Sequence, residues 1–306
     1  MILRTAPTVG DAFWVNKELK TEINKVNILV SEDLIIDANS FASMVGEDII
    51  DLIFEKAPKK IATRVGNSLR HYEKAISLAG VDDEMGMIRL IAAEEELVVA
   101  IFEWLKINEA KMPNHRDFVK KYKNHQVKLS FSPMLDQIGF VLADFMRHGI
   151  TIDGLEDVLH WKLCVVRSDK KVTLRVTNQF GNKIFDQNPL AVSISLPGLS
   201  DDQVIEELYD SFSRSVHDQL GLTVRQYISK RTEYRNKLLY AEDGNIFSMN
   251  DSLELIVENV FSRTLTHLLW SLAILLTNSP ETINWGLINQ FISLYRKLLS
   301  ECNLIN

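Results

Sequence analysis

The stretch from Ile88 to Lys106, IRLIAAEEELVVAIFEWLK, most constrains the fold, because it sets three consecutive carboxylates inside an otherwise apolar helix. A helical projection at about 100° per residue separates the three side chains. Glu95 falls in the middle of one apolar stripe, Glu94 interrupts the adjoining stripe, and Glu96 lies on the remaining polar side. A buried carboxylate is costly unless it is paired or hydrogen-bonded. We therefore expect Glu95 to point into the interior and to meet a partner from elsewhere in the chain.

A partner for Glu95 is predicted on the next helix, which the pattern places over residues 114–131. Phe118, Tyr122, His125 and Leu129 recur there at spacings of four, three and four, which is one helical face. His125 therefore points inward, and Lys128 lies beside it, one turn further on. An inward His and an inward Glu can form a hydrogen-bonded pair. Two interpretations remain open, a pair that only aligns two helices and a pair that belongs to a functional site.

The segment YRNKLLYAEDG, residues 234–244, is the second unusual place in the sequence. On a helix Arg235 shares a face with Leu239, and Asn236 shares a face with Tyr240. A guanidinium with an amide and a phenol hydroxyl nearby can hold a phosphate, because the cation neutralises charge while the other groups supply geometry. The alternative is a solvated, basic helix end.

Basic residues gather in the same two places, residues 106–128 and 225–237. The whole chain carries a net charge of −7 with a pI near 5.6, which argues against a surface that coats DNA. In an acidic protein this coincidence favours a local site for an anionic ligand such as RNA. Solvated charged faces would give the same pattern.

The 306 residues, 46% of them hydrophobic, are enough for one large domain or two smaller ones. Helical periodicity dominates residues 31–147 and 200–303. Between them WKLCVVRS, KVTLRVTNQFGN and LAVSISL are rich in β-forming residues and are separated by turn signals. The prediction is a mainly α (α+β) fold with a small three-stranded antiparallel meander. It divides into an N-terminal helical region (1–150), a meander insertion (151–199) and a C-terminal helical region (200–306) that packs on the first.

Several chemistries have no sequence signature here. The chain lacks a phosphate-binding glycine loop, a dinucleotide fingerprint, a zinc-protease motif and a nucleophile elbow. Its two cysteines lack metal-ligand spacing, so we expect no metal and no cofactor. The N-terminus has no signal-peptide core, and the longest apolar run, Leu265 to Leu276, is too short to span a bilayer. These features predict a cytoplasmic protein without a membrane partner.

Three segments together resemble the HEPN superfamily, in particular its AbiV-type abortive-infection branch: SLRHYEKAISLA, AEEELVVA and FVKKYKNHQVK, within about residues 60–130. The family pattern has a Tyr- and Ala-rich helix face, an Ala-x-Glu-Glu motif and a His-x-x-Lys that ends the next helix. The matching residues are Ala93, Glu95, Glu96, Ala100, His125 and Lys128. The family's Gly-Lys after Glu-Glu is replaced by Val98 and Val99.

HEPN ribonucleases also carry an Arg and a His separated by four to six residues, of which the first is usually polar. Here Arg235 and Asn236 fit this motif, but Tyr240 stands where the His would be; Arg64 and His71 have the spacing but lack the polar residue. The resemblance implies catalytic candidates at Arg235, Asn236, Tyr240 and His125. It also implies binding or structural candidates at Glu95, Glu96 and Lys128.

Two functions follow as expectations. The first is a HEPN-like, RNA-directed effector of a bacterial phage-defence or stress system, which could be a metal-independent ribonuclease. The second is a non-catalytic helical interaction or scaffold protein, in which the Glu-His pair is structural and the meander docks a protein partner. The resemblance also implies a homodimer, because HEPN modules commonly pair through their helices.

Overall fold

The computed structural model describes residues 45–109, 113–148, 162–168, 170–178, 180–196, 198–240, 249, 251–278 and 286–305. It is mostly helical and carries one small antiparallel sheet, so the coarse fold class is confirmed. The helices predicted to begin near residue 31 fall partly outside the described residues, and the first described helix is α2 (Glu47–Lys56).

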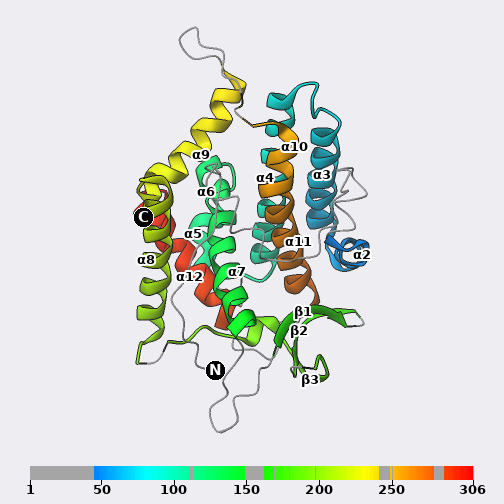
Figure 1. Cartoon of the computed structure of the whole chain (residues 1–306), viewed down its shortest axis with the longest axis vertical. Coiled ribbons are helices and arrows are strands. Elements are labelled where there is room, and N and C mark those ends of the chain that lie inside the picture. Colours follow the sequence, from blue (N-terminus) through cyan, green and yellow to red (C-terminus); the bar gives the residue numbers. More distant parts are fainter. Residues whose placement is uncertain are drawn as a thin grey trace.

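The helix with the three carboxylates lies in the middle of the molecule. It is α4 (Asp83–Ile107), and it packs beside α3 (Lys59–Ile76) on one side and α11 (Ser262–Thr277) on another (Figure 1). Asp82 caps α4 by accepting a hydrogen bond from the Met85 backbone N–H at 3.0 Å. Asp83 and Glu84 then place negative charge at the positive end of the helix dipole.

The prediction of a single helix over residues 114–131 is wrong, because the helix is interrupted twice in this segment. It forms a 3-10 turn, η3 (Pro113–His115), a short α5 (Arg116–Val119) and a separate α6 (His125–Leu129), which α7 (Phe131–His148) follows. Asn124 adopts an extended conformation and its side chain accepts hydrogen bonds from the next turn's backbone at 2.9 and 3.4 Å. This cap makes His125 the first residue of a new helix.

The predicted three-stranded antiparallel meander is present, with β1 (Lys162–Ser168), β2 (Lys171–Thr177) and β3 (Lys183–Gln187) in sequential order. The third strand was predicted at 190–196, and that assignment is wrong. Residues 189–191 form a 3-10 turn, η4 (Pro189–Ala191), and the chain beyond it has no strand partner. Instead, the Gln290 side chain bonds both backbone groups of Ile194, accepting at 2.8 Å and donating at 2.6 Å.

The C-terminal helices begin as the sequence predicts. Ser200 and Thr223 each form a capping box, at the starts of α8 (Asp201–Leu220) and α9 (Val224–Leu239). Residues 253–277 form one helical segment that contains a π turn, giving α10 (Leu253–Ile256), η5 (Val257–Phe261) and α11. The last helix is α12 (Gly286–Glu301).

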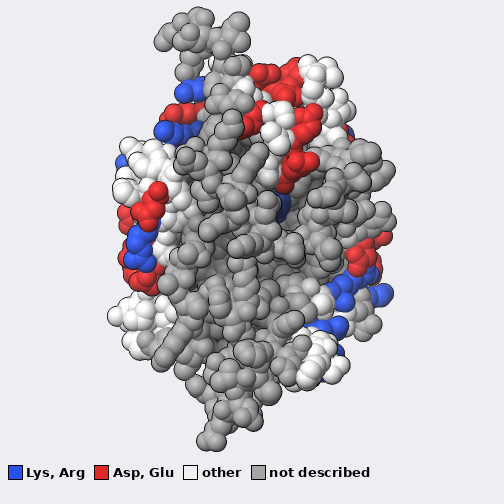
Figure 2. All heavy atoms as spheres, viewed as in Figure 1, with Lys and Arg blue, Asp and Glu red and all other residues white. Residues whose placement is uncertain are grey.

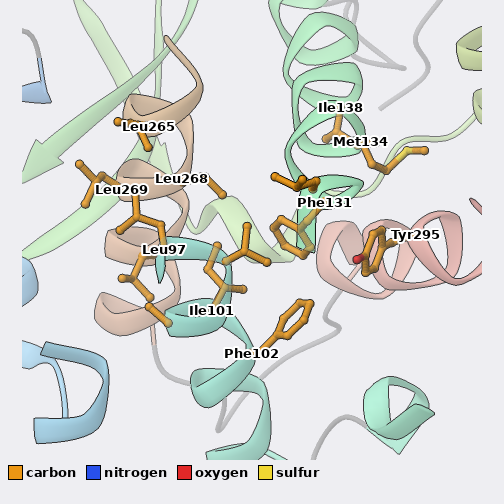
Figure 3. Packing of buried hydrophobic residues seen from close by; sticks show 14 of the residues in the cluster. Leu97, Ile101, Phe102, Phe131, Met134, Ile138, Leu265, Leu268, Leu269 and Tyr295 are labelled. Atoms are coloured by element: carbon orange, nitrogen blue, oxygen red, sulfur yellow. The ribbon is translucent and has the colours of Figure 1, made fainter. Parts of the chain in front are cut away.

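One hydrophobic cluster joins the two helical regions. Leu97, Ile101 and Phe102 of α4 face side chains of α7, α11 and α12 (Figure 3). The segment Leu253–Thr277 has the length and apolar composition of a membrane-crossing helix, but 56% of the residues in its most apolar window are buried inside the structure. Its packing against α4 and α2 is that of a core helix.

Charge is unevenly distributed over the surface. Figure 2 shows acidic side chains at the top of the visible face, where Figure 1 places the α3–α4 turn and α10. Basic side chains lie at the lower right of the same view, near α2 and the sheet. The net negative charge therefore leaves room for locally positive sites.

Gly86 tests how closely α10 packs on α4, and Gly66 of α3 serves as its control. A Cβ at Gly86 would lie 2.2 Å from a methyl carbon of Leu253, which is itself fully buried, whereas a Cβ at Gly66 in α3 would meet no atom within 4 Å. Gly86→Ala should lower the free energy of unfolding by about 1–3 kcal/mol through overpacking. Gly66→Ala should raise it by about 0.5–1 kcal/mol, because the helix loses less backbone entropy on folding. Urea unfolding of both variants measures the difference; equal effects would contradict the close approach.

Candidate active site

The Glu95 carboxylate is the centre of the candidate site. Glu95 is 8% exposed, and three cationic or ionisable side chains surround it. His125 Nδ1 lies 2.5 Å from Oε1, and Lys128 Nζ lies 2.7 Å from Oε2. Arg235 Nε lies 4.0 Å from Oε1. The prediction that Glu95 is buried and bonded to His125 is confirmed.

Three elements bring these groups together. α4 contributes the carboxylate, α6 contributes His125 and Lys128 three residues apart on one face, and α9 contributes Arg235. α6 packs against both α4 and α9. Residues far apart in the sequence thus form one cluster, and the two basic segments noted in the sequence meet here.

The exposure of the cluster is graded from the inside outward. The side chains of Glu95 and Lys128 are each 10% exposed, that of Arg235 is 23% exposed and that of His125 is 37% exposed. Within the described chain Arg235 makes no hydrogen bond, and His125 Nε2 has no partner either. Glu95 therefore bonds His125 and attracts Arg235, and the nitrogens of these two side chains that have no described partner can reach a ligand.

The carboxylate also sets the chemistry of the imidazole. An acceptor at Nδ1 favours the tautomer with a proton on that nitrogen, which leaves Nε2 as the basic nitrogen. Lys128 and Arg235 bring two positive charges against the single negative charge of Glu95. The cluster is therefore positive overall, and it combines a potential general base with a guanidinium.

Asn236 and Tyr240 lie apart from this cluster. Both are exposed, Tyr240 by 67%, and their side chains make no hydrogen bond to any described residue. Residues five apart on a helix point about 140° from each other, so Arg235 and residue 240 face different directions. Tyr240 also ends α9 in an extended conformation. The structure unites Arg235 with His125 and places the other two motif positions on the neighbouring surface.

Glu96 faces α3, on another side of α4. Arg64 NH1 donates to both of its carboxylate oxygens at 3.0 Å in a half-exposed ion pair. His71, on the same helix as Arg64, lies 3.4 Å from Arg89. Burial and the Arg89 charge lower the pKa of His71, which keeps it neutral near pH 7. Glu96 therefore belongs to a separate surface network.

The most deeply buried carboxylate is Glu94, whose partner the sequence reading missed. Glu94 is 1% exposed and accepts from Arg231 NH2 at 2.9 and 3.2 Å. Burial raises the pKa of Glu94, and the Arg231 charge opposes that rise. The hydroxyl of Tyr227 lies 3.5 Å from the same guanidinium. In the sequence, Glu94 is marked by its position inside an apolar stripe. No sequence pattern marks Arg231 of α9 as its partner.

A second His-carboxylate pair lies deeper along the same bundle. His267 Nδ1 on α11 is 2.7 Å from Oδ1 of Asp136 on α7. Asp136 is buried, whereas the His267 side chain is 38% exposed. Each residue belongs to a short polar interruption of an apolar segment, Asp136 with Gln137 and His267 with Thr266, which is the signal that could have marked them. Asp136 also interacts electrostatically with Arg231, so this pair adjoins the buried Glu94–Arg231 pair.

Comparisons with protein-family models, with curated proteins and with solved structures give no significant match. Within the described ranges of the chain, no three His, Cys, Asp or Glu side chains lie close enough to share a metal ion. A family assignment therefore rests on the short motifs of α3, α4 and α6.

Substitution at Glu95 should cost far more stability than substitution at Glu96. Glu95→Ala leaves Lys128 and His125 inside without their acceptor, so we expect a loss of about 2–4 kcal/mol in the free energy of unfolding. Glu96→Ala removes a half-exposed ion pair and should cost about 1 kcal/mol or less. Urea denaturation of both variants decides, and equal small losses would contradict the buried role of Glu95.

The Glu94–Arg231 pair should show strong energetic coupling. Glu94→Ala removes the carboxylate that accepts from the buried Arg231 guanidinium and should cost about 3–5 kcal/mol. Replacing both residues by Met should cost much less than the sum of Glu94→Met and Arg231→Met, because an apolar pair needs no counter-charge. A double-mutant cycle measured by denaturant unfolding tests this, and additive losses would show that the two side chains are not coupled.

Proposed function

We propose that the protein is a HEPN-like, RNA-directed effector, and that the Glu95 cluster is its phosphate-binding and catalytic site. The observation that carries the proposal is the meeting of Arg235 and His125 at one buried carboxylate, from helices 110 positions apart in the sequence. A positive cluster with a half-exposed imidazole and guanidinium suits the phosphodiester backbone of RNA. The resemblance in residues 60–130 supports a place in a bacterial phage-defence or stress system.

The cluster contains the groups for metal-independent cleavage of RNA. His125 Nε2 takes the proton of a ribose 2′-hydroxyl, and the resulting oxygen attacks the adjacent phosphorus. The P–O5′ bond breaks with its electron pair on the departing oxygen, which takes a proton from water, and a 2′,3′-cyclic phosphate remains. Arg235 stabilises the negative charge that grows on the phosphoryl oxygens in the transition state. Glu95 orients the imidazole and Lys128 balances the charge of Glu95.

A non-catalytic scaffold is the second candidate. The observation that favours it is the burial of Glu95 and Lys128 where α4, α6 and α9 meet, which is where an ion pair would align three helices. In that case the exposed surface of the meander is the expected docking site for a protein partner. The two candidates differ in whether Arg235 and His125 have a role beyond stability.

Arg235→Ala, compared with Arg225→Ala, separates the candidates. Both substitutions remove one arginine from α9, but Arg225 is exposed, whereas Arg235 borders Glu95. We expect Arg235→Ala to reduce RNA binding and cleavage at least about tenfold, the loss of one charge-assisted contact of about 1.4 kcal/mol or more, while Arg225→Ala keeps both. Stability should change by about 1 kcal/mol or less in each case. Gel-shift binding and cleavage of a labelled RNA give the readouts.

His125→Ala should abolish cleavage while retaining most of the binding, because the imidazole acts on the reacting hydroxyl. Unchanged activity in Arg235→Ala and His125→Ala, together with its loss on substitution within the sheet, would rule out the nuclease and favour the scaffold.

A further inference from the structure

An apolar pocket, partly open to its surroundings, lies between core helices, apart from the Glu95 cluster. Its volume is about 120 Å³, and its walls come from α4, α5, α7, η4, α11 and α12. Phe118, Phe131 and Phe291 contribute rings, and Leu135 with other Leu and Ile side chains supplies most of the remaining surface. Figure 3 shows the neighbouring region, where Phe131 of α7 points toward side chains of α4 and α12.

The walls restrict the chemistry of an occupant. The described lining contains no charged side chain, and its one hydroxyl is that of Ser271. A charged ligand would lose its hydration there without gaining a partner, which is prohibitively costly. Water is also poorly held, because a buried water needs two to four polar partners. Only a neutral, apolar group gains on entering.

The size of the cavity restricts the occupant further. The space is close to that of an apolar cavity of about 150 Å³ known to bind benzene. It is too small for a helix or a strand of a protein partner. While the pocket is empty, its apolar walls stay in contact with solvent. A ligand that fills it would remove that apolar surface from water.

We propose that this cavity is a binding site for a small, neutral, apolar molecule, with the size of one aromatic ring or a short hydrocarbon chain. The site is separate from the Glu95 cluster and requires no RNA. It lies beside the aromatic group around Tyr295, because Phe118, Phe131 and Phe291 contact that residue with ring centroids 5.0, 5.1 and 6.1 Å away.

Benzene and benzoate, added to the 306-residue chain, test the site. Both have the same ring, but only benzene is neutral. We expect benzene to raise the midpoint of thermal unfolding by a few degrees in a concentration-dependent way, because it binds the native state alone. Calorimetric titration should show saturable binding with a negative heat-capacity change. Benzoate should produce neither effect.

Ser271→Leu fills the cavity and should abolish the benzene response while raising the midpoint of the free protein. Thr266→Leu, on the same helix but outside the cavity lining, is the matched control and should keep the full response. If Ser271→Leu does not fold, Leu135→Phe fills the same space from α7. No binding of benzene to the wild type, or equal binding by the wild type and a filled variant, would overturn the proposal.

Discussion

Two adjacent buried carboxylates on α4 determine where the helices around them must lie. Glu94 and Glu95 point about 100° apart, so their carboxylates meet different partners. Each carboxylate needs a cation, because an isolated charge in an apolar core costs several kcal/mol. α9 meets this need at Glu94 through Arg231, and α6 meets it at Glu95 through Lys128. The packing of α4, α6 and α9 is thus an electrostatic requirement as well as a hydrophobic one.

Two arginines of α9 lie beside the buried carboxylates and differ in burial and bonding. Arg231 and Arg235 are one turn apart on the same helix. The Arg231 side chain is 9% exposed and its guanidinium is bonded to Glu94, whereas that of Arg235 is 23% exposed and stands 4.0 Å from Glu95. The buried pair fixes the rotation of the helix, so the second arginine has a defined place beside His125. An arginine that is held in place but free to bond pays little entropy when an anion binds.

The sequence predicts the parts of this arrangement that repeat locally. Periodicity identified Glu95 as an inward residue, because it follows the apolar face of α4. The partner His125 was found from a helical face that the structure breaks between α5 and α6, so that pattern does not explain its position. Periodicity could not identify the Arg231–Glu94 pair, because the two residues are 137 positions apart and no local pattern records which helices meet. The sequence did not predict the helix break before α6, because Asn124 stands among polar residues and nothing distinguishes it from them as a helix cap.

The misplaced third strand has a different physical cause. Residues 190–196 have the composition of a strand, but the backbone groups of Ile194 are satisfied by the side-chain amide of Gln290. Gly286, at the start of α12, lets the two segments approach, because a Cβ there would lie 2.8 Å from Ser193 Cβ. The composition of a segment can indicate an extended backbone, but its tertiary contacts determine whether that backbone joins a sheet.

α6 shows how the core reaches the candidate active site. A helix of five residues is unstable alone, so its position depends on contacts from outside it. Lys128 is bonded to Glu95, and the Tyr295 hydroxyl donates to the Val127 carbonyl from the opposite side. Tyr295 in turn packs against Phe118 and Phe131, which also line the apolar cavity. The packing thus connects the walls of the pocket to α6, the helix that begins with His125, through Tyr295.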